Sequence, residues 1–171
     1  MAVKIDLEKA YDRLEWIFIR DTLGLFKFPN QLISLIMSCV STSFIYILCN
    51  GGALYSFLPS KGIRQGNPLS PYLFILCMEV LGALITENCN SNLWDPVKVT
   101  QGGLAFSHIF FVDDLVLFMK ADCKNYLAVK DVLDCFCSLS GQKVSQDKSR
   151  VYFSLNVSGD NRDELCEILG F

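Results

Sequence analysis

Histidine is nearly absent from this sequence. The 171 residues include one histidine, His108, and none of the eight cysteines forms a CxxC pair with another. Structural zinc sites combine cysteine and histidine at such close spacings, so the sequence argues against zinc. No apolar leader opens the chain, and the cysteines lie mostly in apolar runs. We therefore expect buried, reduced thiols in an intracellular protein of the nucleus or cytoplasm.

Basic charge and very long apolar runs are also scarce. Lysine and arginine number 15 against 18 acidic residues, a net charge of −3. Phosphate contacts need basic side chains, so any nucleic-acid function must explain this deficit. The most apolar run, residues 71–85, is shorter than the roughly 20 residues of a membrane span and contains Glu79. It predicts a buried core helix and no membrane partner, within one domain that has one core.

Helical and strand patterns are mixed along the chain. We expect helices at residues 12–26, 28–41, 70–89, 122–140 and 160–170. Strands are expected at 3–7, at 44–50 and 53–58 joined by Gly51 and Gly52, on both sides of a pair of aspartates near residue 113, and at 150–155. Asp12 with Glu15, Ser70 and Asp122 are candidate helix caps, and Gly141 a helix stop. This order predicts an α+β fold with helices packed on a mainly antiparallel sheet.

Two adjacent carboxylates, Asp113 and Asp114, interrupt the apolar run FFVDDLVLF. Burying unpaired carboxylates is costly, and a cation between them removes the cost. Oxygen ligands favour Mg²⁺ or Mn²⁺. Asp6 ends the first predicted strand, and two adjacent strand ends could share two metal ions. The alternatives are a surface turn for the pair, against which the apolar flanks weigh, and a capping role for Asp6.

The loop GIRQGNPLSP, residues 62–71, is rich in glycine and proline. Gly62 and Gly66 allow a backbone to approach a ligand closely, and Arg64 and Gln65 offer donors to a sugar, base or phosphate. The helix that follows directs its positive end toward this loop. An ordinary connector is the alternative interpretation.

Four segments together resemble a known family. They are KIDLEKAYDRLEW, GIRQGNPLSPYLFILCMEVL, SHIFFVDDLVLF and SGQKVSQDKS, in this order. The chain is similar to the reverse transcriptase domain of plant non-LTR (LINE-type) retrotransposons from about Val3 to Phe171. The resemblance implies a partial domain over residues 1–171, with a polymerase palm, part of the fingers and no thumb.

The resemblance also implies roles for individual residues. Asp6 and Asp113 match the principal metal ligands, Asp114 is the neighbour of the second, and the Leu7 carbonyl joins the first. Tyr11 matches an aromatic gate that senses the sugar 2′ position, while Gln65 and Gly66 line the nucleotide pocket. Lys148 matches a lysine that protonates the leaving pyrophosphate, although a solvated loop lysine is an equal alternative.

The implied reaction is RNA-templated DNA synthesis with Mg²⁺ or Mn²⁺, and the implied partners are an RNA template, a DNA primer and a dNTP. Three positions depart from the family pattern. Val112 stands where the family usually has alanine, Asn67 where it has aspartate, and Ser145 where it has asparagine. The family's basic fingers would precede Val3 and its thumb would follow Phe171, which would explain the charge deficit. We expect weak or no polymerase activity from this chain alone. The alternatives are a catalytically silent remnant acting as an interaction module, and a non-templated nucleotidyl transferase or cyclase.

Overall fold

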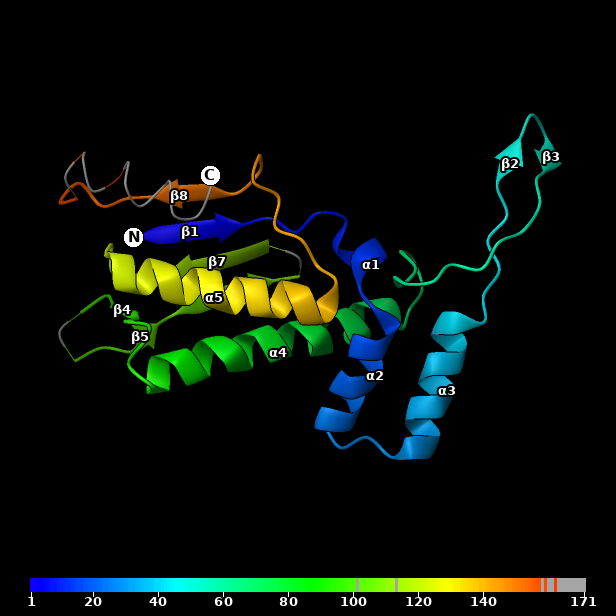
Figure 1. The fold of residues 1–171 in the computed structure, drawn as a ribbon, viewed down its shortest axis with the longest axis horizontal. Coiled ribbons are helices and arrows are strands. Elements are labelled where there is room, and N and C mark those ends of the chain that lie inside the picture. Colours follow the sequence, from blue (N-terminus) through cyan, green and yellow to red (C-terminus); the bar gives the residue numbers. More distant parts are fainter. Residues whose placement is uncertain (101, 113, 158, 160–161, 163–171) are drawn as a thin grey trace.

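The computed structural model in Figure 1 describes residues 1–100, 102–112, 114–157, 159 and 162. The elements along the chain are β1 (Ala2–Ile5), α1 (Ala10–Arg13), α2 (Trp16–Leu25), α3 (Asn30–Ser41), β2 (Leu48–Cys49), β3 (Gly52–Ala53), α4 (Ser70–Asn90), β4 (Val97–Lys98), β5 (Ala105–Phe106), β6 (His108–Phe111), β7 (Asp114–Phe118), α5 (Cys123–Ser140) and β8 (Arg150–Tyr152). The predicted α+β class is confirmed. Most of the predicted helix at 160–170 lies outside the described residues.

A four-stranded antiparallel sheet organises the domain, in the order β6-β7-β1-β8. β1 is central, because Ala2 pairs with Phe118 of β7 on one side and with Tyr152 of β8 on the other. Alternation along β1 buries Val3 and Ile5. The core therefore lies on one face of the sheet.

Two helices cover that buried face, and Figure 1 shows α4 and α5 running side by side along it. Leu115 and Leu117 of β7 meet the apolar residues of both helices in one cluster. Phe18 of α2 packs edge-on against Phe136 of α5, with ring centroids 5.8 Å apart. Among the described residues, α4 is the one helix long and apolar enough to cross a membrane. Eight of its residues are buried here, so it serves as a core helix, as the sequence predicts.

The segment from Ser43 to Leu58 leaves the domain as a narrow arm, seen at the upper right of Figure 1. The arm contains β2 and β3, which are shorter than the predicted strands. Its turn is formed by Asn50 and Gly51, both at positive φ (49° and 82°), and not by Gly51 and Gly52. Asn-Gly is the sequence most favoured in such two-residue turns. The sequence prediction had instead assigned Asn50 to the strand at 44–50.

The predicted helix at 12–26 is confirmed over α2 but wrong at its start, because the chain is extended at Leu14 and Glu15. The Leu14 carbonyl accepts a hydrogen bond from the Gly62 amide at 2.8 Å, and the Glu15 amide donates to the Ser140 carbonyl at 2.9 Å. Distant segments thus take the backbone groups that a continuous helix would use. Asp12 lies inside α1, so the predicted capping box is also wrong.

Of the other predicted helix ends, those at Asp122 and Gly141 are confirmed and the one at Ser70 is wrong. Asp122 caps α5, since its side chain accepts from the Asn125 amide at 2.9 Å, and Gly141 ends that helix at φ 74°. Ser70 does not cap α4, because it is already the first helical residue. The Asn67 side chain accepts from the Leu69 amide at 2.9 Å and so satisfies a donor near the start of α4.

The cysteines are less buried than expected. Of those that the structure describes, four are exposed: Cys39, Cys49, Cys123 and Cys135. Cys77 is buried in α4, where desolvation raises the pKa of its thiol to about 12. The apolar runs that carry the exposed cysteines are amphipathic or lie on the arm, so neighbouring apolar residues did not predict burial.

Candidate active site

Asp6 lies just beyond the end of β1, on the face of the sheet opposite the helices. Alternation places its side chain with that of Lys4, while Ile5 and Leu7 are buried. The backbone of Asp6 is held from the side of β8: its amide donates to the Ser149 hydroxyl at 3.2 Å, and its carbonyl accepts from the Ser145 amide at 2.8 Å. The carboxylate is partly exposed, with 32% of the side-chain surface accessible. It is thus presented to solvent from a fixed backbone.

Asp114 begins β7, the strand next to β1. Ile5 pairs with Leu115, so continuing this antiparallel register places Asp6 opposite Asp114. Asp114 Oδ1 lies 2.8 Å from the Lys4 ammonium. The hydrogen bond to Asp114, the charge of Asp114 and, more weakly, the charge of Asp6 raise the pKa of Lys4. The Lys4 ammonium is therefore the counter-ion of Asp114, and the Asp6 charge acts on it only weakly.

Asp113, the second predicted metal ligand, lies outside the described residues. The residue before it, Val112, is described, and its φ of 56° lies in the left-handed region. A β-branched residue rarely adopts this conformation, so the backbone is strained beside the aspartate pair. The β6–β7 hairpin is confirmed by the pairing of Phe111 with Asp114.

Lys148 lies near the Asp6 carboxylate, with its Nζ 4.0 Å from Asp6 Oδ1. Its side chain is 73% exposed, so the contact is weak and open to displacement. Leu7 forms a bridge with Val144, and the flanking hydrogen bonds use the Asp6 carbonyl and the Glu8 amide. Consecutive carbonyls of an extended segment point to opposite sides, so the Leu7 carbonyl is directed toward the β7 side, where Asp114 lies.

Tyr11 and the glycine-rich loop meet at the start of α4. The Tyr11 ring stacks on Phe74 of α4, with centroids 4.8 Å apart and an interplanar angle of 12°. The Tyr11 carbonyl accepts from the Ile63 amide at 2.8 Å, and Trp16 Nε1 donates to the Gly62 carbonyl at 2.7 Å. Gly62 has a φ of 84°, and a Cβ there would lie 2.7 Å from the Asp12 carbonyl oxygen. The loop thus requires glycine to dock at this position.

The middle of the loop, from Arg64 to Gly66, is exposed. Arg64 donates through Nη2 to the Phe44 carbonyl at 3.0 Å, at the base of the arm. Gln65 and Gly66 are exposed, and Gly66 has a φ of 85°. A cavity of about 590 Å³ is lined by Arg64 and Gln65 together with Asp12, Lys61 and others. The loop therefore offers polar groups to solvent next to Tyr11.

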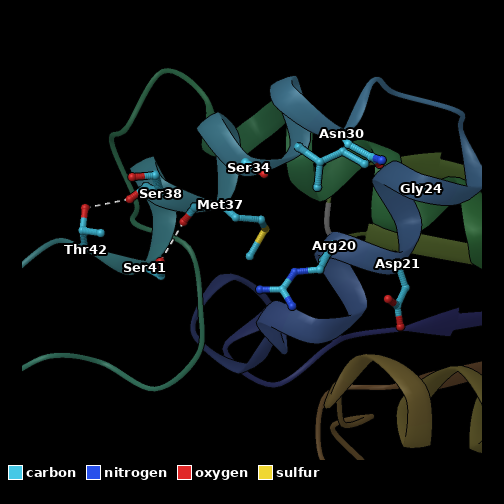
Figure 2. Close-up of a pocket in the computed structure, with 10 residues that line it drawn as sticks. Arg20, Asp21, Gly24, Asn30, Ser34, Met37, Ser38, Ser41 and Thr42 are labelled. Carbon is cyan, nitrogen blue, oxygen red and sulfur yellow. Dashed lines mark hydrogen bonds between the residues drawn. The ribbon is translucent and has the colours of Figure 1, made fainter.

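A second cavity, of about 780 Å³, lies between α2 and α3 and contains none of the predicted site residues. Figure 2 shows Arg20 reaching from α2 toward α3. The hydroxyls of Ser41 and Thr42 donate to carbonyls of their own helix, at 2.8 and 2.7 Å. These two hydroxyls are therefore already bonded to the backbone beside the cavity.

The described side chains supply some, but not all, of the ligands that a divalent cation needs. Two carboxylates, Asp6 and Asp114, lie at neighbouring strand ends, and both are neutralised by lysines. Within residues 1–100, 102–112 and 114–157 no group of three His, Cys, Asp or Glu side chains could hold a metal by itself. The donors are all oxygen, which suits Mg²⁺ or Mn²⁺ and not zinc.

Several contributors were missed in the sequence. Lys4 stands two residues from Asp6, and strand alternation alone could have placed the two on one face. Ser145 and Ser149 contact the Asp6 backbone, but no local pattern marks them. Trp16 is a further contributor, because its indole holds the glycine-rich loop.

The chain belongs to the reverse transcriptase (RNA-dependent DNA polymerase) family, whose sequence pattern matches residues 1–171. It is 27% identical over 165 residues to the Retrovirus-related Pol polyprotein from type-2 retrotransposable element R2DM of Drosophila melanogaster. That match covers 96% of this chain and 14% of the polyprotein. The chain is also 38% identical over 71 residues to an uncharacterized mitochondrial protein, AtMg01250, of Arabidopsis thaliana, covering 42% of this chain and 58% of that protein. Retrotransposon-type reverse transcriptases are thus among its relatives.

Solved structures share the fold. Telomerase from Candida albicans matches with a TM-score of 0.65 at 18% identity, over 92% of this chain and 27% of that one. Telomerase from Candida tropicalis, truncated from its C-terminal domain, matches with a TM-score of 0.64 at 19% identity, over 92% and 31%. The polymerase palm predicted from the sequence is confirmed by this likeness.

Proposed function

We propose that this chain is the palm region of an RNA-directed DNA polymerase from a plant-type non-LTR retrotransposon, acting in the nucleus or cytoplasm. The observation that carries the proposal is the meeting of Asp6 and Asp114 at adjacent strand ends, with Lys4 and Lys148 as counter-ions. The Arabidopsis relative supports a plant-type origin. The substrates would be a dNTP, a DNA primer and an RNA template.

The proposed site places each group for one task. Asp6, Asp113 and Asp114, with the Leu7 carbonyl, would hold Mg²⁺ or Mn²⁺. The bound ions would lower the pKa of the primer 3′-hydroxyl and stabilise charge on the triphosphate.

The substrate-binding groups lie along the adjoining segment. The stacked ring of Tyr11 would form a rigid wall at the sugar 2′ position. Arg64, Gln65 and the Gly66 backbone would contact the nucleotide. Lys148 would hold a proton beside Asp6 for the leaving pyrophosphate.

Manganese binding tests this proposal directly. Titration of the chain with Mn²⁺, followed by electron paramagnetic resonance, should show binding that Asp6→Asn weakens by about tenfold or more, because a ligand loses its charge. Asp131→Asn removes an exposed carboxylate on α5 and is the matched control. Equal affinities for both variants would contradict the metal site.

A second candidate is a catalytically silent module that binds a partner through the exposed apolar arm. Extension of oligo(dT) on poly(rA) by the purified chain separates the two. Weak incorporation that Asp6→Asn abolishes supports the polymerase. No incorporation by the wild type, together with equal Mn²⁺ binding by wild type and Asp6→Asn, supports the silent module.

A further inference from the structure

The segment that follows α5 runs alongside the segment that carries Asp6. Its contacts begin where the Ser140 carbonyl accepts from the Glu15 amide at 2.9 Å and continue where Gln142 Nε2 donates to the Ala10 carbonyl at 2.6 Å. They end at Asp6 itself. Figure 1 shows this segment passing the end of β1 on its way from α5 to β8.

The last part of this contact is a closed turn formed by residues 145–149. The Ser149 amide donates to the Ser145 carbonyl at 2.9 Å. The Ser145 amide donates to the Asp6 carbonyl at 2.8 Å, and the Ser149 hydroxyl accepts from the Asp6 amide at 3.2 Å. Both serines are buried, at 8% and 2% exposure. One turn therefore binds both backbone polar groups of Asp6.

This arrangement matters because β1 ends at Ile5, one residue before Asp6. A residue past the end of a strand lacks the ladder hydrogen bonds that fix its neighbours. The turn supplies these bonds from the side of β8. The same turn carries Lys148, whose ammonium lies 4.0 Å from the Asp6 carboxylate. The turn that holds the Asp6 backbone thus also brings a lysine toward its carboxylate.

We infer that Ser149 is a positioning residue for Asp6: its hydroxyl holds the Asp6 backbone so that the carboxylate stays at the place where a divalent cation would bind. This inference rests on the proposed function for the role of the cation, but the contact itself does not. Outer partners that orient a metal ligand commonly change metal affinity by 10–100-fold when they are removed.

Ser149→Ala tests the inference, with Ser140→Ala as the matched control. Ser140 is equally buried, and its hydroxyl donates to the Phe136 carbonyl at 2.6 Å and accepts from the Gln142 amide at 3.2 Å, without contacting Asp6. Ser149→Thr keeps the hydroxyl. Each variant is studied below its melting temperature, by amide exchange at Asp6 using NMR and by Mn²⁺ titration.

Ser149→Ala should speed Asp6 amide exchange and raise the Mn²⁺ dissociation constant about tenfold. Ser140→Ala should lower the melting temperature but leave both readouts near wild type, and Ser149→Thr should restore them. The inference is overturned if Ser149→Ala matches wild type in Asp6 exchange, or if Ser140→Ala alters it equally. If wild type binds no Mn²⁺, the metal part of the proposed function fails, while Asp6 exchange still decides the role of Ser149.

Discussion

The four-stranded sheet and the arm are both built from apolar sequence, yet only the sheet buries it. Leu115 in β7 is fully buried, whereas Leu48 in β2 is 77% exposed and Tyr55 is 99% exposed. Residues 43–58 contain no charged residue at all. A two-stranded hairpin is marginal in water without a third strand or a helix to cover it. Apolar composition alone therefore does not stabilise a segment; the layer that packs against it does.

The largest difference should come from truncating one leucine in each region. Leu115→Ala leaves a cavity in the core and should lower the free energy of unfolding by about 3 kcal/mol. Leu48→Ala removes atoms that already contact water and should cost less than about 0.5 kcal/mol. Urea denaturation followed by fluorescence of the buried Trp94 reports on the domain. Equal costs for the two variants would show that the arm is part of the cooperative core.

A pair of glycines at positive φ sharpens the comparison. A Cβ at Gly141 would lie 2.6 Å from Glu15 Cγ and 2.8 Å from the Arg13 carbonyl oxygen, whereas nothing lies within 4 Å of one at Gly51. Gly141→Ala should cost about 2 kcal/mol, from left-handed strain and the clash. Gly51→Ala carries the strain alone and should cost about 1 kcal/mol or less. The same urea transitions measure both, and a smaller cost at Gly141 would mean that the contact between 140–149 and 6–15 is loose.

The two hairpin turns give the smallest effect. Val112 and Asn50 both have left-handed φ, 56° and 49°, but asparagine tolerates this region and valine does not. Val112→Gly should raise the free energy of unfolding by about 0.5–1 kcal/mol, as strain relief exceeds the added chain entropy. Asn50→Gly should change it by only a few tenths of a kcal/mol. Thermal melting of the two variants against wild type checks this, and destabilisation by Val112→Gly would contradict strain at the turn.

What the sequence predicted follows from how local each signal is. The apolar run of α4 and the Asp122 and Gly141 ends of α5 depend on residues within the element itself, and they were predicted well. The break at Leu14 could not be predicted, because Gly62 and Ser140 cause it from far along the chain. For the same reason, the contact between Ser149 and Asp6 could not be predicted.

The candidate site shows the same division. The sequence predicted that Asp6 lies at the end of its strand, and Asp114 lies at the adjacent end of β7. It could not identify Lys4 as the counter-ion of Asp114, because that depends on the register of β1 against β7. Residue types indicated the chemistry, and only the strand pairing indicated which groups neutralise one another.

The central place of β1 governs the order in which the domain can assemble during synthesis. β1 is paired on both sides only after Phe118, and then Tyr152, have been synthesised to pair with Ala2. The ribosome makes β1 long before either partner, so this apolar strand stays unpaired at least until Phe118 has been translated. The proposed catalytic carboxylate on Asp6 acquires its final geometry only when the turn before β8 has emerged.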